Sequence, residues 1–140
     1  MAVKITGRST GATTMELVHE SGAIITTMAP KDNGGDGSAF SPTDLCAASL
    51  GACGTTIMAL FARDKGIPVT GISFTLEKEM ASGPRRIARL TIAYLIAGEL
   101  TETERQRIEG AGRACPVRVT LGDRVEIVES YEFVPEAKLP

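Results

Sequence analysis

The sequence of 140 residues is poor in the side chains that most enzyme sites use, with one histidine (His19) and three cysteines. A histidine-assisted catalytic triad and a multi-histidine metal site therefore have little support. The glycine-rich segment at 34–37 lacks both the G-x-G-x-x-G spacing and the lysine of a nucleotide-binding loop. We therefore expect neither a cofactor nor a metal.

The sequence also lacks a large excess of charge of either sign and a long apolar run. A net charge of −2 gives no electrostatic reason to bind nucleic acid or an anionic membrane. The N-terminus has no apolar signal-peptide run, and Ala47–Ala62 is interrupted by glycine and threonine before reaching the roughly 18 residues of a membrane helix. We expect a cytoplasmic location, with no nucleic acid and no membrane as partner. An odd number of cysteines in a reducing compartment leaves catalytic or inert thiols.

The pattern of apolar residues predicts an α+β fold. Six strands are predicted, at Val3–Arg8, Thr13–His19, Ala23–Met28, Gly71–Met80, Arg85–Ala97 and Arg124–Phe133. One helix is predicted from Leu45 to Lys65, and a second from Thr101 towards Cys115. The order βββ-α-ββ-α-β favours a mostly antiparallel sheet around a long central helix, in a single domain over residues 1–140. Residues 134–140 are expected to fray.

The first helix has a clear start. Ser41 is predicted as its N-cap, Pro42 occupies the first helical position, and Asp44 takes the place of a capping-box acid. Few charges precede Arg63, so the helix is apolar on nearly all sides. Such a helix is expected to be buried in the domain or in an oligomer interface.

Two of the cysteines stand in distinctive settings. Cys53 lies among small residues of the first helix, where inert packing as a small hydrophobe is the ordinary expectation. Cys115 precedes Pro116, which predicts Cys115 as the N-cap of a new turn. The exposed amides of that turn, with Arg113 and Arg118 nearby, would favour a thiolate there; a helix break without chemistry is the alternative.

Cys46 precedes Cys53 by seven residues on the same helix. At about 1.5 Å per residue the two are roughly 10 Å apart, which is too far for a disulfide within one helix. We interpret Cys46 as a packing or interface residue.

The run from Ser41 to Cys53 (SPTDLCAASLGAC), followed by Cys115-Pro116-Val117, resembles the OsmC/Ohr family. The similarity extends over essentially the whole chain. It implies an OsmC-like fold, an intertwined homodimer with its active sites at the subunit interface, and thiol-dependent reduction of organic hydroperoxides. By position, Cys53 resembles the peroxidatic cysteine of the family and Cys115 the resolving cysteine. Their disulfide would then be reduced by an external dithiol.

The chain departs from the family pattern at the residues that activate the thiolate. The hydroperoxide reductases of this family carry a glutamate just after the helix-initial proline, and an arginine from the N-terminal strands. Here Thr43 follows Pro42, Asp44 stands one position further, and Arg8 is the arginine that precedes the first helix. These three residues are the candidates for assisting Cys53. The alternatives are a weakly active or non-catalytic dimer that binds a small apolar ligand at its interface, or a redox sensor.

Overall fold

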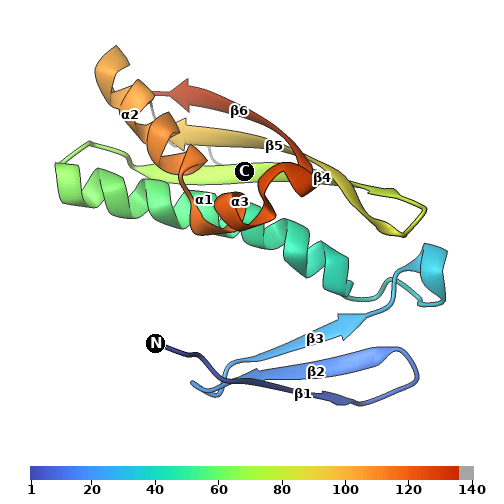
Figure 1. The fold of residues 1–140 in the computed structure, drawn as a ribbon. Helices are drawn as coiled ribbons and strands as arrows, with labels where there is room; N and C mark the ends of the chain where they lie inside the picture. The colour runs from blue at the N-terminus through green and yellow to red at the C-terminus, as the bar shows by residue number, and fades with distance from the viewer. Residues whose placement is uncertain (136–140) are drawn as a thin grey trace. The chain divides into compact units, whose positions relative to one another are not determined.

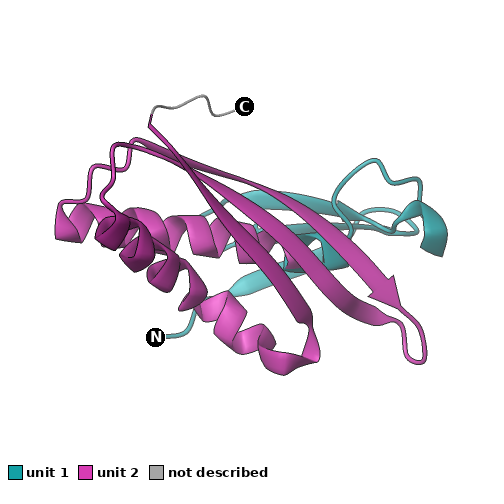
Figure 2. Cartoon of the chain, turned by 90° about the horizontal axis from the view of Figure 1, so that it is seen from above, with its two compact units in different colours: residues 1–46 teal, residues 47–140 magenta. Residues whose placement is uncertain are grey.

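The structure, a computed structural model, describes residues 1–135 and contains two compact units (Figure 1). The first is Met1–Cys46 and the second begins at Ala47 (Figure 2). Each contains one three-stranded sheet, and helices accompany the sheet of the second unit. The predicted α+β class is confirmed. Residues 136–140 of the expected frayed tail lie outside the described residues, whereas Val134 belongs to the last strand.

The first unit is an antiparallel meander. Its strands are β1 (Ile5–Ser9), β2 (Thr14–His19) and β3 (Ile24–Met28), followed by a short 3-10 turn, η1 (Lys31–Asn33). The β2–β3 turn uses Gly22 at φ +90°, a conformation that favours glycine. His19 lies at this turn, with Nδ1 2.8 Å from the Ser21 hydroxyl, so a structural role explains it.

Helix α1 (Pro42–Lys65) begins as its sequence predicts. The amide of Asp44 donates to Ser41 Oγ at 3.0 Å, and the amide of Ser41 donates to Asp44 Oδ2 at 2.9 Å. These reciprocal bonds form a capping box, which satisfies amides that the first helical turn leaves without a partner. The helix ends before Gly66, which has φ +64°.

The apolarity of α1 exceeds what its interrupted sequence suggests. By length and composition alone the helix could cross a membrane, so the expectation that no stretch reaches this limit was wrong. Its glycines and threonines are too few to offset the alanines, leucines and methionine around them. Core helices of globular proteins meet the same criterion, and α1 buries one face in the chain. The buried residues recur every three or four positions: Ala47, Leu50, Gly51, Gly54, Met58 and Ala62.

The sheet of the second unit combines antiparallel and parallel pairing. Strands β4 (Gly71–Ala81) and β5 (Arg86–Ala97) are antiparallel, whereas β6 (Glu126–Val134) runs parallel to β5. A parallel neighbour requires a crossover connection. Here it consists of α2 (Glu102–Arg113), α3 (Pro116–Leu121) and a final 3-10 turn, η2 (Gly122–Arg124). The predicted capping box at Thr101 and Glu104 is present at the start of α2.

Helices α1 and α2 pack closely on one face of this sheet (Figure 1). A Cβ atom on Gly51 would overlap the Phe74 ring of β4, and one on Gly54 would overlap the Tyr94 hydroxyl of β5. On α2, a Cβ on Gly112 would lie 2.9 Å from the Tyr131 hydroxyl and 3.1 Å from the Met58 sulfur. Glycine at these points therefore sets the distance between helix and sheet.

The close approach at Gly51 predicts a specific instability. Gly51→Ala should lower the free energy of unfolding by about 1–3 kcal/mol, because its methyl group must displace the Phe74 ring. Gly110→Ala, at an exposed position of α2, is the matched control, since no atom of a neighbouring element lies within 4 Å of its added Cβ. That change should stabilise by about 0.5–1 kcal/mol through helix propensity. Urea unfolding measures both, and equal stability of the two variants would contradict the packing described.

Candidate thiol site

The second unit brings Cys53 and Cys115 together. Cys53 lies on α1 and Cys115 directly precedes α3, and their side chains form a hydrogen bond. Cys53 is half-buried, whereas the exposed fraction of Cys115 is 0%. Cys46 is exposed, and all three cysteines are thiols outside any disulfide. The fold thus brings into contact two cysteines that lie 62 positions apart in the sequence.

Cys115 occupies the N-cap position that the Cys-Pro sequence predicts. Its backbone is extended, Pro116 is the first helical residue, and the Cys115 sulfur accepts the amide N–H of Arg118 at 3.3 Å. Proline suits this position because its missing N–H would have no partner in the first turn. The prediction of a new turn at Cys115 is confirmed.

The prediction that this environment favours a Cys115 thiolate was wrong. Burial raises the pKa of the Cys115 thiol, and the hydrogen bond with Cys53 adds to the rise. The amide N–H groups of Arg118 and Val117 act in the opposite direction but do not offset the burial. The neighbouring guanidinium groups of Arg113 and Arg118 are both paired with Glu129. At neutral pH Cys115 is therefore a protonated, buried thiol.

Glu129 of β6 is the centre of a cluster of charged side chains. Its side chain is 5% exposed, and Arg113 Nη1 and Arg118 Nη2 each lie 2.9 Å from its Oε1 atom. Arg118 Nε lies 3.2 Å from both carboxylate oxygens, and the Tyr131 hydroxyl donates to Oε2 at 3.3 Å. The hydrogen bond to Glu129 raises the pKa of Arg118. The cluster joins the end of α2, helix α3 and strand β6.

Two tyrosines connect this cluster to the sulfurs. Tyr94 and Tyr131 face each other across the β5–β6 pair, with ring centroids 5.1 Å apart and planes 20° from parallel. The Tyr94 hydroxyl donates to the Leu50 carbonyl at 3.4 Å. Burial raises the pKa of Tyr94, and the negative charge of Glu129 raises it further. Burial and Glu129 likewise raise the pKa of Tyr131, so both hydroxyls keep their protons at neutral pH.

Sequence reasoning missed Tyr94, Glu129 and Tyr131. A signal for Glu129 was present, because it falls in phase with Ile127, Tyr131 and Phe133 on the inward face of β6. A carboxylate on an apolar strand face is costly unless it is paired. Its two partners, Arg113 and Arg118, could not be assigned to it without the parallel register of β6.

The three assisting candidates have structural partners in the first unit. Asp44 closes the capping box with Ser41, and the Thr43 hydroxyl lies 3.2 Å from the Ser41 hydroxyl. Arg8 lies opposite Glu16 in the β1–β2 pair, with Nη2 2.9 Å from its carboxylate. Along α1, Asp44 is nine residues from Cys53, which corresponds to roughly 13 Å and the opposite face of the helix. Within α1, then, Asp44 does not reach the thiol.

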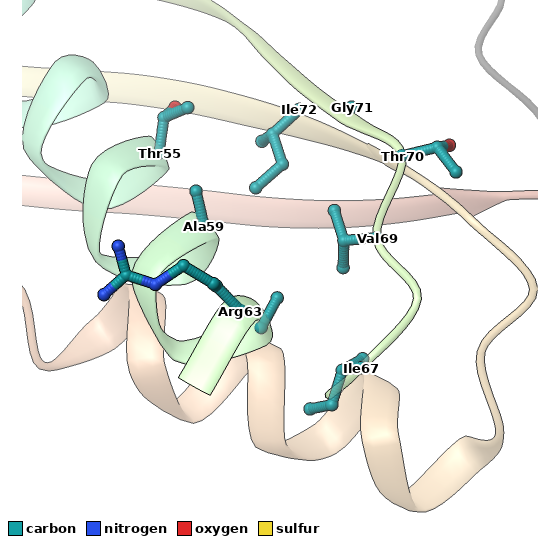
Figure 3. Close-up of a pocket in the computed structure, with 9 residues that line it drawn as sticks. Thr55, Ala59, Arg63, Ile67, Val69, Thr70, Gly71 and Ile72 are labelled. Atoms are coloured by element: carbon teal, nitrogen blue, oxygen red, sulfur yellow. The ribbon is translucent and has the colours of Figure 1, made fainter. Parts of the chain in front are cut away.

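A separate cavity of about 300 Å³ lies towards the end of α1 (Figure 3). Its lining includes Thr55, Ala59, Arg63, Ile67, Val69 and Ile72, and neither thiol. Arg63 Nη2 is 2.9 Å from Asp64. The cavity is therefore distinct from the thiol pair. Within residues 1–135, no group of three or more His, Cys, Asp and Glu side chains is arranged to hold a metal ion.

The different settings of the thiols predict different reactivities. Because only the thiolate is alkylated, the buried thiol of Cys115 should react with iodoacetamide at least roughly tenfold more slowly than exposed Cys46. Cys53 should react at an intermediate rate. Timed alkylation of the folded, reduced protein followed by peptide mass spectrometry measures the three rates. Labelling of Cys115 as fast as Cys46 would contradict its burial.

The raised pKa of Cys115 also predicts a loss of stability at alkaline pH. Between the unfolded and folded pKa values the folded state binds more protons, so the free energy of unfolding falls as pH rises through this range. Cys115→Ser should show a smaller fall between pH 8 and about 9, where tyrosines are still mostly protonated in both states. Urea unfolding of reduced protein across this range makes the comparison. An equal fall in the free energy of unfolding for the parent and Cys115→Ser would contradict the raised pKa of Cys115.

Comparison with known proteins identifies relatives of this chain. Residues 35–130 match the family described as OsmC-like protein. A solved structure of a putative osmotic stress induced and detoxification response protein from Psychrobacter arcticus is 33% identical, with 96% of each chain covered and a TM-score of 0.81. No curated protein is similar enough to match.

More distant solved structures share the fold. An OsmC-like protein from Mycoplasma pneumoniae is 20% identical, with 96% of this chain and 98% of that chain covered and a TM-score of 0.81. The organic hydroperoxide resistance protein OsmC from Legionella pneumophila is also 20% identical, with 94% and 97% covered and a TM-score of 0.71. With the family match over residues 35–130, these similarities show that the chain belongs to the OsmC-like protein family.

Proposed function

We propose that this protein is a thiol peroxidase that reduces organic hydroperoxides to alcohols through Cys53 and Cys115. Its family includes organic hydroperoxide resistance proteins, which supports a stress-related redox role. The observation that carries the proposal is the hydrogen bond between the two thiols, which lie on separate elements of one compact unit. Two cysteines in such contact can exchange a sulfenic acid for a disulfide without a large rearrangement.

The unequal burial of the thiols supports the order of their roles. Cys53 is partly exposed and can meet a substrate, whereas Cys115 is buried and protonated. Cys53 is therefore the attacking residue and Cys115 the resolving one. The apolar residues packed beside them, such as Ile57 and Leu50, suit a bulky organic peroxide better than hydrogen peroxide.

The proposed reaction balances without a cofactor. The Cys53 thiolate attacks the terminal peroxide oxygen, the O–O bond breaks, and the leaving alkoxide takes a proton to become the alcohol. Cys53 is left as a sulfenic acid. The Cys115 sulfur then attacks it, an S–S bond forms, and the sulfenic oxygen leaves as water with the Cys115 proton. An external dithiol reduces the disulfide by thiol exchange.

Assembly and location complete the proposal. By resemblance to the family the protein acts as a homodimer, and Thr43, Asp44 and Arg8 are candidates to assist Cys53 in that assembly. A cytoplasmic location suits the reaction, because that compartment supplies dithiol reductants and keeps Cys46 reduced.

The test is turnover of cumene hydroperoxide or tert-butyl hydroperoxide with dithiothreitol as reductant. Cys53→Ser should reduce the rate to that of dithiothreitol alone, because no other sulfur would form the sulfenic acid. Cys46→Ser, on the same helix, is the matched control and should keep the parent rate. Equal rates for Cys53→Ser and parent would sink the proposal.

Peptide mass spectrometry without reductant separates the enzyme from a non-catalytic dimer. One equivalent of organic hydroperoxide should produce a Cys53–Cys115 disulfide in the parent protein and a trappable Cys53 sulfenic acid in Cys115→Ser. Unmodified thiols would instead indicate a dimer that binds a small apolar ligand. Hydrogen peroxide at the same concentration should oxidise Cys53 more slowly than either organic peroxide.

A further inference from the structure

Glu129 is a buried carboxylate that the proposed reaction does not use. It lies on β6, is 5% exposed, and pairs with two arginines that come from different helices. Burying a carboxylate is unfavourable unless its partners compensate the lost hydration. Both arginine partners of Glu129 belong to the helices that flank Cys115.

Arg118 links Glu129 to the Cys115 sulfur. Its side chain meets both Glu129 oxygens, with Nε at 3.2 Å from each and Nη2 at 2.9 Å from Oε1. Its backbone amide donates to the Cys115 sulfur at 3.3 Å. One residue thus carries both contacts. Fixing the guanidinium on β6 restricts the first turn of α3, and with it the amide that holds the sulfur.

Arg113 fixes the segment before Cys115 in the same way. Its Nη1 atom lies 2.9 Å from Glu129 Oε1, and its guanidinium also lies over the Tyr131 ring, 5.1 Å from the centroid. Arg113 is the last residue of α2, and Pro116 is the first of α3. Glu129 therefore fixes the chain on both sides of Cys115.

We propose that Glu129 is a positioning residue that holds the Cys115 sulfur against Cys53 by fixing Arg118 and Arg113. This inference builds on the proposed function for its role in turnover, but the formation of the disulfide tests it independently. In the resolving step the Cys115 sulfur displaces the hydroxyl of the Cys53 sulfenic acid, and water leaves. That displacement depends on the distance and direction between the sulfurs, which the Glu129 contacts restrict.

The first measurement is the equilibrium of the Cys53–Cys115 disulfide with reduced and oxidised glutathione. This equilibrium gives the effective concentration of the two thiols for one another, which reports how well the folded protein holds the two sulfurs together. Glu129→Gln should lower this value at least roughly tenfold, because an amide offers one acceptor oxygen and no negative charge to the two guanidinium groups. Glu126→Gln is the matched control: Glu126 is on the same strand and pairs with Arg89 at 2.9 Å, outside α2 and α3. It should keep the parent value.

A double-variant cycle tests the path through Arg118. Arg118→Gln should lower the effective concentration as Glu129→Gln does, and the double variant should lie within about threefold of either single variant. The Arg118 side chain is 33% exposed, so this substitution keeps the test usable if Glu129→Gln fails to fold. Arg118→Lys retains the charge without the forked contact and should recover part of the loss.

The second measurement is the lifetime of the Cys53 sulfenic acid after one equivalent of cumene hydroperoxide. Glu129→Gln should lengthen it while the initial oxidation of Cys53 keeps the parent rate. If Glu129→Gln lowers the free energy of unfolding of the reduced protein but leaves the effective concentration of the thiols unchanged, the proposal is overturned, since Glu129 would then be only structural. If the parent protein does not react with peroxide, the proposed function fails, and the glutathione equilibrium still decides the role of Glu129.

Discussion

Helix α1 lies close against β4 and β5 because Gly51 and Gly54 have no side chain there. A methyl group at either position would overlap Phe74 or the Tyr94 hydroxyl. Cys53 stands between these glycines in the sequence, so the same contact that brings the helix to the sheet brings its sulfur towards the core. A helix displaced by larger residues would carry Cys53 away from Cys115. The site therefore depends first on backbone packing and only then on its polar groups.

The second requirement is that the helix is interrupted at the right place. Pro116 ends the run of helix that α2 begins, and Cys115 becomes an N-cap whose sulfur accepts an amide. Since β6 is parallel to β5, the chain must cross over the sheet through α2 and α3. This crossover places the helix interruption at Cys115 beside the Tyr94–Tyr131 pair. Glu129 then forms ion pairs with both arginines of the crossover. Because these guanidinium groups pair with the carboxylate, burial remains the main influence on the pKa of the Cys115 thiol.

Local patterns predicted the strands, both capping boxes and the turn at Cys115, because each depends on residues within a few positions of one another. The long-range features were not accessible in this way. The alternation that predicted β6 did not reveal its parallel direction, and without that register neither the tyrosine stack nor the partners of Glu129 follow. The wrong prediction for Cys115 has the same origin: its neighbours suggested a thiolate, but burial and the Arg–Glu129 pairs depend on tertiary structure.

The buried, protonated state of Cys115 fits its proposed role better than the thiolate that the sequence suggested. A second exposed thiolate would compete with Cys53 for peroxide and could be oxidised beyond recovery. A buried thiol meets only the neighbour it contacts, and its attack on the Cys53 sulfenic acid releases water instead of a charged group. Its low intrinsic reactivity is offset by position, since proximity can supply several kcal/mol to such a step. Accurate placement of Cys115 is then what the surrounding contacts must provide, and Arg118, held by Glu129, donates its backbone amide to the Cys115 sulfur.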